Sequence, residues 1–149
     1  MKKAFVALTL LLLLCACVQQ ERKHSLTTNK FTAELKKFYI KNNTGWIQIE
    51  AKNNSSAQIT EFFIMMKFID AHGKDVWTFG ECIKYKDLSK IPKETIERWK
   101  KLGTFNEHAI LSSPLNPGNK ITIELPLPPE AKITEIKDYQ ILKLELKCP

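Results

Sequence analysis

The sequence predicts a mainly β protein, an antiparallel β-sandwich that carries one short inserted helix. Apolar and polar residues alternate along several segments, as they do in strands with one buried face. About seven such segments, separated by turn residues at short spacing, favour a sandwich over a barrel. One segment, residues 92–102, has helical spacing instead.

Residues 1–16 have the composition of an export signal. Lys2 and Lys3 supply a positive start, and the apolar run from Ala4 to Ala16 is interrupted only by Thr9. A helix needs about 20 apolar residues to cross a hydrocarbon core, so this run is too short for a retained transmembrane segment.

The stretch Leu14-Cys15-Ala16-Cys17 resembles the lipobox at which bacterial lipoprotein precursors are cleaved and acylated. The resemblance implies cleavage after Ala16, palmitate or related acyl chains on Cys17, and lipid anchoring to a membrane of the bacterial cell envelope, the outer membrane in a diderm. Cys15 is the weaker acceptor because it would place the bulky Leu14 at the cleavage site. An ordinary secretory signal cut nearby is the alternative.

Without residues 1–16 the chain has 133 residues, which suits one domain with a real core. We expect residues 17–30 to be the lipidated Cys17 and a flexible polar tether, which reaches at most roughly 45 Å when extended. Residues 31–149 should form the sandwich. The mature chain carries 21 basic and 16 acidic residues spread along its length, so we expect no nucleic-acid partner.

Cys82 and Cys148 are the two cysteines that remain in the exported domain. We expect a structural disulfide between them, with two unpaired buried thiols as the alternative. Neither lies in a CxxC motif or beside a histidine, so a redox or nucleophilic role is not expected.

The first half of the domain has the pattern of an antiparallel meander. A first strand is expected around residues 35–41. Residues 44–52 then alternate, and their predicted buried face is Ile47, Ile49 and Ala51. Residues 59–70 form a richer strand, whose predicted buried face is Phe62, Ile64, Met66 and Phe68.

A short hairpin connects this strand to the next one, over residues 75–84. Asp70 can bond within its own turn, and Gly73 can take the left-handed conformation. These two residues predict a tight connection over residues 70–74.

The second half continues with two more strands. Pro117-Gly118 predicts a turn, and the strand after it alternates as far as Pro126, which cannot donate to a ladder and so marks an end or an edge. The final strand is expected over residues 138–147. Its predicted buried face is Leu142, Leu144 and Leu146.

The inserted helix is predicted over residues 92–102. Pro92 suits a helix start, Gly103 suits its end, and opposite charges recur four residues apart. Ile96, Trp99 and Leu102 share a face. This face either packs across an open end of the sandwich or forms a surface for a partner.

The meander also carries a family resemblance. Lys52-Asn53-Asn54-Ser55, the segment from Ile59 to Asp70, Gly73-Lys74 and the turn and strand from Asn116 to Pro126 resemble the immunoglobulin-like FxLYD group of envelope proteins. In that group's motif Met66, Phe68 and Ile69 take the positions of Phe, Leu and Tyr, and Asp70 agrees. The resemblance implies an immunoglobulin-like sandwich without catalytic residues, in which residues 81–115 are an insertion.

The sequence shows no spacing typical of a catalytic or metal site. His24, His72 and His108 stand apart, without an HxH or HExxH pattern or a neighbouring thiol. We therefore expect no catalytic residues, no metal and no cofactor.

Two classes of function remain. The expected one is a noncatalytic binding or scaffold module that is anchored to the membrane and binds an envelope protein or wall component, with Ile96, Trp99 and Leu102 as the binding residues. The alternative is a small periplasmic or surface hydrolase or ligand carrier with a site built from distant residues. A filled core with a shallow apolar patch would favour the first, and a deep pocket with converging polar groups the second.

The lipobox resemblance predicts that Cys17→Ser releases the protein from the membrane fraction and abolishes acyl-chain labelling, because the anchoring thiol is gone. Cys15→Ser is the matched control and should change neither. Continued acyl labelling of the Cys17→Ser protein would contradict the assignment.

Overall fold

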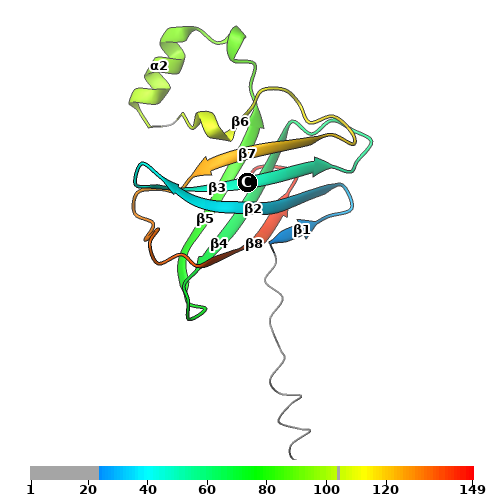
Figure 1. The fold of residues 1–149 in the computed structure, drawn as a ribbon. Helices are drawn as coiled ribbons and strands as arrows, with labels where there is room; N and C mark the ends of the chain where they lie inside the picture. Colours follow the sequence, from blue (N-terminus) through cyan, green and yellow to red (C-terminus); the bar gives the residue numbers. More distant parts are fainter. Residues whose placement is uncertain (1–23, 104) are drawn as a thin grey trace, which may run out of the picture.

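The structure is a computed structural model that describes residues 24–103 and 105–149. The predicted signal, Cys17 and residues 18–23 of the predicted tether lie outside the described residues. The described chain forms two packed four-stranded sheets, which confirms the β-sandwich (Figure 1). The strands are β1 (Ser25–Thr27), β2 (Phe31–Lys41), β3 (Thr44–Asn53), β4 (Glu61–Ile69), β5 (Asp75–Tyr85), β6 (Ile110–Leu111), β7 (Lys120–Pro126) and β8 (Asp138–Glu145).

The strand order is β1-β2-β3-β7 in one sheet and β6-β5-β4-β8 in the other. All pairings are antiparallel except the short parallel pairing of β5 with β6. In immunoglobulin domains strand B lies between A and E, and strand C lies between C′ and F. Here β3 lies between β2 and β7, as B lies between A and E. Likewise β4 lies between β5 and β8, as C lies between C′ and F. The connectivity is therefore immunoglobulin-like.

Two tight turns account for the hairpins. Asn42 and Asn43 both have positive φ, 51° and 58°, as a two-residue turn between twisted strands requires. Between β4 and β5, Asp70 accepts hydrogen bonds from the backbone N–H groups of His72 and Lys74, and Gly73 has φ +81°. These bonds hold the pKa of the Asp70 carboxyl below its usual value. The predicted hairpin at residues 70–74 is confirmed.

The core lies between the two sheets and is built from alternating strand residues. The faces predicted for β3 and β4 are confirmed, because every residue on them is fully buried. Against them pack Phe31, Ala33 and Leu35 from β2, Ile83 from β5 and Ile123 and Leu125 from β7. β7 ends at Pro126 and lies at the edge of its sheet, as expected for a residue that cannot donate to a ladder.

The face predicted for the last strand is wrong in part. Ile141 and Leu144 are buried, whereas Leu142 is 45% exposed. The register with β4 shifts between Met65 and Met66, and Leu142 is the unpaired extra residue. Such a bulge reverses the alternation on one side of it, which period-2 reasoning does not anticipate.

The domain also starts earlier than residue 31. Ser25–Thr27 form β1, which pairs with β2, and the side chain of His24 bonds to the Asp138 carboxylate at 2.9 Å. Residues 24–30 are therefore part of the sandwich and not of a tether. The sequence did not predict β1, because the segment is polar. Of the three residues of this edge strand only Leu26 is half-buried, and one apolar residue makes no alternating pattern.

Asn53, at the end of β3, is a fully buried polar residue at the end of the sandwich. Its side-chain amide donates to the carbonyls of Ala57 and Leu115, at 2.7 and 2.8 Å, and its side-chain oxygen accepts from the backbone N–H of Ser55. Leu115 in turn exchanges two backbone hydrogen bonds with Ile59. One side chain thus joins two of the three segments that cross between the sheets, residues 54–60 and 112–119; the third is residues 127–137.

Asn53→Ala should lower the free energy of unfolding by roughly 3 kcal/mol, because the four hydrogen bonds of this buried side chain to Ser55, Ala57 and Leu115 are lost. Urea denaturation of the full-length protein measures this change. Asn54→Ala is the matched control, since Asn54 is exposed and its amide bonds only to the Thr32 hydroxyl. An equal and small loss in both variants would show that Asn53 is not the joint.

Cys82 in β5 and Cys148 beyond β8 are brought to disulfide distance, with their Cα atoms 5.6 Å apart. This separation lies within the range that a disulfide spans without backbone movement. The two strands are not neighbours, because β4 lies between them. The sandwich geometry therefore permits the predicted bridge.

We expect Cys82 and Cys148 to be linked if the protein is exported as predicted, and peptide mapping without reductant should then recover the linked pair. Closure of a loop of 66 residues contributes at most about 4 kcal/mol to stability by chain entropy. Cys82→Ser and Cys148→Ser should each cause the same loss as reduction. Free thiols at both positions in the exported form would rule out the bridge.

Candidate functional site

The chain leaves the sandwich after β5 and returns at β6, and we call residues 86–109 the excursion. It contains a short 3-10 helix (Leu88–Lys90), the helix α2 (Lys93–Lys101) and a second 3-10 helix (Glu107–Ala109). Asp87 starts the first by accepting hydrogen bonds from Ser89, which lowers the pKa of its carboxyl. Gly103, with φ +66°, follows α2 as predicted. The excursion lies within the predicted insertion, residues 81–115.

Helix α2 does not enter the core, because none of its residues is buried. Figure 1 shows it above β7 and beyond the upper ends of β5 and β6, on the opposite side of the molecule from β1. Of the predicted binding residues, Ile96 and Trp99 are half-buried, and Leu102, just after the helix, is 67% exposed. The sequence left two alternatives for this face. The first, packing across an open end of the sandwich, is not what the structure shows.

The half-buried apolar face of α2 is covered from within the excursion. The rings of Trp99 and Phe105 stack with centroids 6.3 Å apart, and Lys86 holds its ammonium 5.0 Å from the centre of the Trp99 ring. Lys100 lies similarly over Phe105. Cations over aromatic faces are stabilising. Phe105 and Lys86 complete a cluster of which the sequence indicated only Trp99.

The returning leg of the excursion is fastened to both sheets. Asn106 donates its side-chain amide to the Glu81 carboxylate of β5, at 2.9 Å. Two residues later the His108 ring meets the Trp46 ring of β3 edge-on, with centroids 4.9 Å apart. Trp46 in turn stacks on Tyr39 of β2. These contacts fix the base of the excursion to the sandwich, although its helix projects beyond it.

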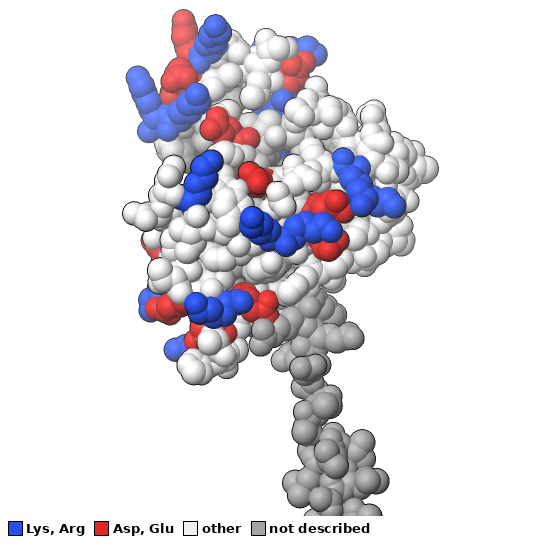
Figure 2. Space-filling model, viewed as in Figure 1, with Lys and Arg blue, Asp and Glu red and all other residues white. Residues whose placement is uncertain are grey.

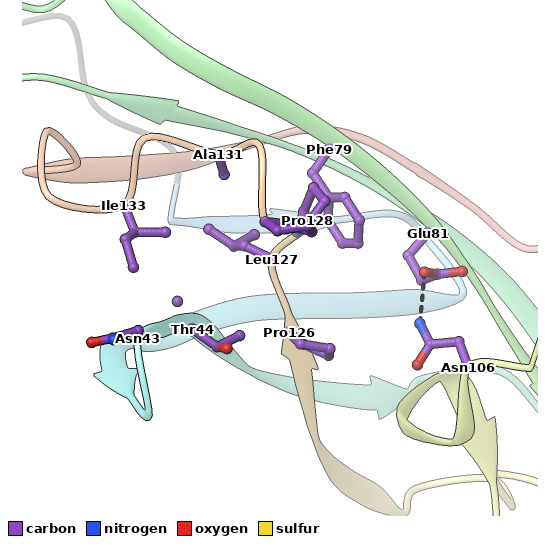
Figure 3. Close-up of a pocket in the computed structure, with 12 residues that line it drawn as sticks. Asn43, Thr44, Phe79, Glu81, Asn106, Pro126, Leu127, Pro128, Ala131 and Ile133 are labelled. Carbon is purple, nitrogen blue, oxygen red and sulfur yellow. Dashed lines mark hydrogen bonds between the residues drawn. The ribbon is translucent and has the colours of Figure 1, made fainter. Parts of the chain in front are cut away.

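A hollow of about 640 Å³ lies beside this base, between the end of β7, the start of β3 and the inner side of β5 (Figure 3). Its wall is largely apolar, and it is formed by Phe79, Pro126, Leu127, Pro128, Ala131 and Ile133 together with Asn43, Thr44 and Gly45. Glu81 and its partner Asn106 supply the polar end. Ile133, in the loop between β7 and β8, packs against Gly45 of β3. A Cβ atom on Gly45 would come within 2.7 Å of the Ile133 side chain, so glycine suits this close approach.

Charged side chains are mixed in sign on the face that Figure 2 shows. Basic residues gather on the excursion around α2, with acidic side chains between them. The last turn of α2 contains Arg98, Lys100 and Lys101, and Lys100 pairs with Glu97 at 3.3 Å. The excursion therefore presents an apolar residue, Leu102, at the end of a predominantly basic helix turn.

Each of the three histidines makes a different contact, and the contacts lie in different parts of the sandwich. His24 bonds to Asp138, the backbone of His72 bonds to Asp70, and His108 packs on Trp46. Among residues 24–103 and 105–149, no group of three or more His, Cys, Asp or Glu residues is placed to hold a metal ion. In the same part of the chain, no helix is long and apolar enough to cross a membrane.

Comparisons with family models, curated proteins and solved structures find no match to this chain. The resemblance to the FxLYD group stays a prediction, as does the lipobox.

Proposed function

We propose that the protein is a membrane-anchored envelope lipoprotein that acts as a noncatalytic binding or scaffold module, with the excursion as its binding surface. The observation that carries the proposal is Leu102, an exposed apolar side chain on an element whose base is fastened to both sheets. An exposed apolar side chain is a candidate contact for a partner, since burying it on association removes apolar surface from water. An envelope protein or wall component is the proposed partner.

The position of the excursion fits an anchored module. β1 and α2 lie on opposite sides of the molecule (Figure 1). Since the sandwich begins near residue 24, a chain anchored through Cys17 would have only residues 17–23 between lipid and domain, a reach of at most about 25 Å. The domain would then be held close to the membrane, with the excursion directed away from it.

The alternative, a small hydrolase or ligand carrier, would use the hollow. Its lining includes one carboxylate, Glu81, which already accepts hydrogen bonds from Asn106 and from the backbone N–H of Cys82. His108 is not among the lining residues. Turnover of a wall or ester substrate by the purified protein would overturn the noncatalytic proposal.

A photo-crosslinking residue at position 102 should capture a defined partner in intact cells, identified by mass spectrometry. The matched control is position 40, because Ile40 is also an exposed apolar residue, 50% accessible, on the β2–β3 hairpin. Leu102→Ser should weaken partner binding by at least about tenfold while stability changes by less than about 0.5 kcal/mol. The same products at positions 102 and 40 would contradict the proposed surface.

Trp99→Ala should weaken binding as well, with a β-rich circular dichroism spectrum that is nearly unchanged. Because Trp99 packs on Phe105 and Lys86, this variant tests the shape of the excursion, whereas Leu102→Ser tests its surface. If Trp99→Ala unfolds the sandwich, the assignment of Trp99 to the binding surface fails.

A further inference from the structure

Strand β5 has an open edge over most of its length. It pairs with β4 from Asp75 to Lys84, but on its other side β6 pairs only with Lys84 and Tyr85. In the part of the chain that the structure describes, no other strand is paired with β5 on that side. An unpaired edge is a template for a further strand unless it is blocked.

The hydrogen-bond register identifies the groups at this edge. The backbone N–H of Tyr85 donates to Thr60 on the β4 side, at 2.7 Å. Residues of an antiparallel pair alternate between bonding to the neighbour and pointing away from it. The N–H and C=O groups of Thr78, Gly80 and Cys82 therefore point away from β4, and Thr78 and Gly80 are exposed.

One of these outward groups already has a partner, and this supports the register. The N–H of Cys82 donates to a carboxylate oxygen of Glu81, at 3.0 Å. The other oxygen of Glu81 accepts from Asn106. The Glu81 carboxylate therefore occupies the outward N–H of Cys82. The outward backbone groups of Thr78 and Gly80, further along the same edge, are not covered by it.

The hollow lies along the same stretch of β5. Phe79 and Glu81, which alternate with Thr78 and Gly80, both line it (Figure 3). Directly opposite residues of paired strands place their side chains on the same face. A strand added at this edge would therefore direct alternate side chains into the hollow, one opposite Phe79 and one opposite Glu81.

We propose that the free edge of β5 binds an extended segment of another protein as an added strand, and that this segment has a basic residue two positions from an apolar one. Backbone bonds to Thr78 and Gly80 would supply affinity, and the two side chains would supply specificity. The apolar side chain would fill the hollow beside Phe79 and Leu127. The basic side chain would pair with Glu81, whose two bonds come from uncharged donors. The site is separate from the surface around Leu102, so each proposal can fail alone.

A second copy of this chain fits the edge less well. An antiparallel pairing of two β5 strands about Gly80 would set Phe79 of one copy against Glu81 of the other. Each carboxylate would then face an aromatic ring and no cation, at the cost of its hydration. We therefore assign the edge to a different protein with a basic residue in its strand.

The test uses a fluorescent seven-residue peptide of threonines with Lys at its third position and Leu at its fifth, added to the full-length protein. Binding should be seen by anisotropy, and amide exchange at Thr78 and Gly80 should slow. A peptide with Glu in place of Lys should bind about tenfold more weakly. Glu81→Gln should abolish this preference.

Thr78→Pro removes an edge donor without breaking the β4 ladder, since the N–H of Thr78 points away from β4. It should weaken peptide binding by about tenfold, whereas the matched control Thr78→Val should not change it. If Thr78→Pro does not fold, exchange at Thr78 and Gly80 in the unaltered protein decides the question. Unchanged exchange at a millimolar peptide concentration, or protection that grows with protein concentration alone, would overturn the proposal.

Discussion

The buried side chain of Asn53 is the interaction on which the sandwich depends. Of the three segments that pass between the sheets, two, residues 54–60 and 112–119, lie at the end of β3. A crossing segment leaves its backbone carbonyls without ladder partners, and buried carbonyls without partners are costly. Asn53 bonds to one carbonyl in each crossing, while Ile59 and Leu115 pair with each other beside it. Asn53 therefore holds together, at one end of the sandwich, two segments that are far apart in the sequence.

The two sides of the sandwich are closed differently. On one side β1 and β8 lie near each other, and His24 bonds to Asp138 across them. On the other side β7 and β5 leave the sheets open, and the returning leg of the excursion lies there. Asn106 reaches β5 and His108 reaches β3, so this leg links the sheets through side chains and not through a strand. The hollow is the space that this partial closure leaves.

The excursion and the β5 edge are two consequences of the same arrangement. β6 pairs only with the last two residues of β5, so the rest of that edge of β5 is unpaired. The excursion, which connects β5 to β6, projects beyond the two strands. Glu81 lies where these features meet, since its carboxylate protects Cys82, holds Asn106 and lines the hollow. Glu81 is therefore in contact both with the base of the excursion and with the edge of β5.

The sequence by itself determined the class of fold, the buried faces of β3 and β4, the hairpin at residues 70–74 and the inserted helix, because these depend on residues close in the chain. Alternation of apolar residues and the turn preferences of Asn, Asp and Gly are local properties. They also brought Ile96, Trp99 and Leu102 to attention as a candidate surface.

Only the tertiary structure decided the features that depend on distant residues. Asn53 is a polar residue that ends a strand pattern, yet it is buried and bonds to Leu115, which is distant in the sequence. Leu142 follows the alternation but is turned outward by a bulge whose register is set by Met65 and Met66 of β4. Glu81 and Asn106 carry no local pattern, and they meet because the excursion returns along β5. Contacts of this kind arise from the packing of two sheets, which no period within a single strand encodes.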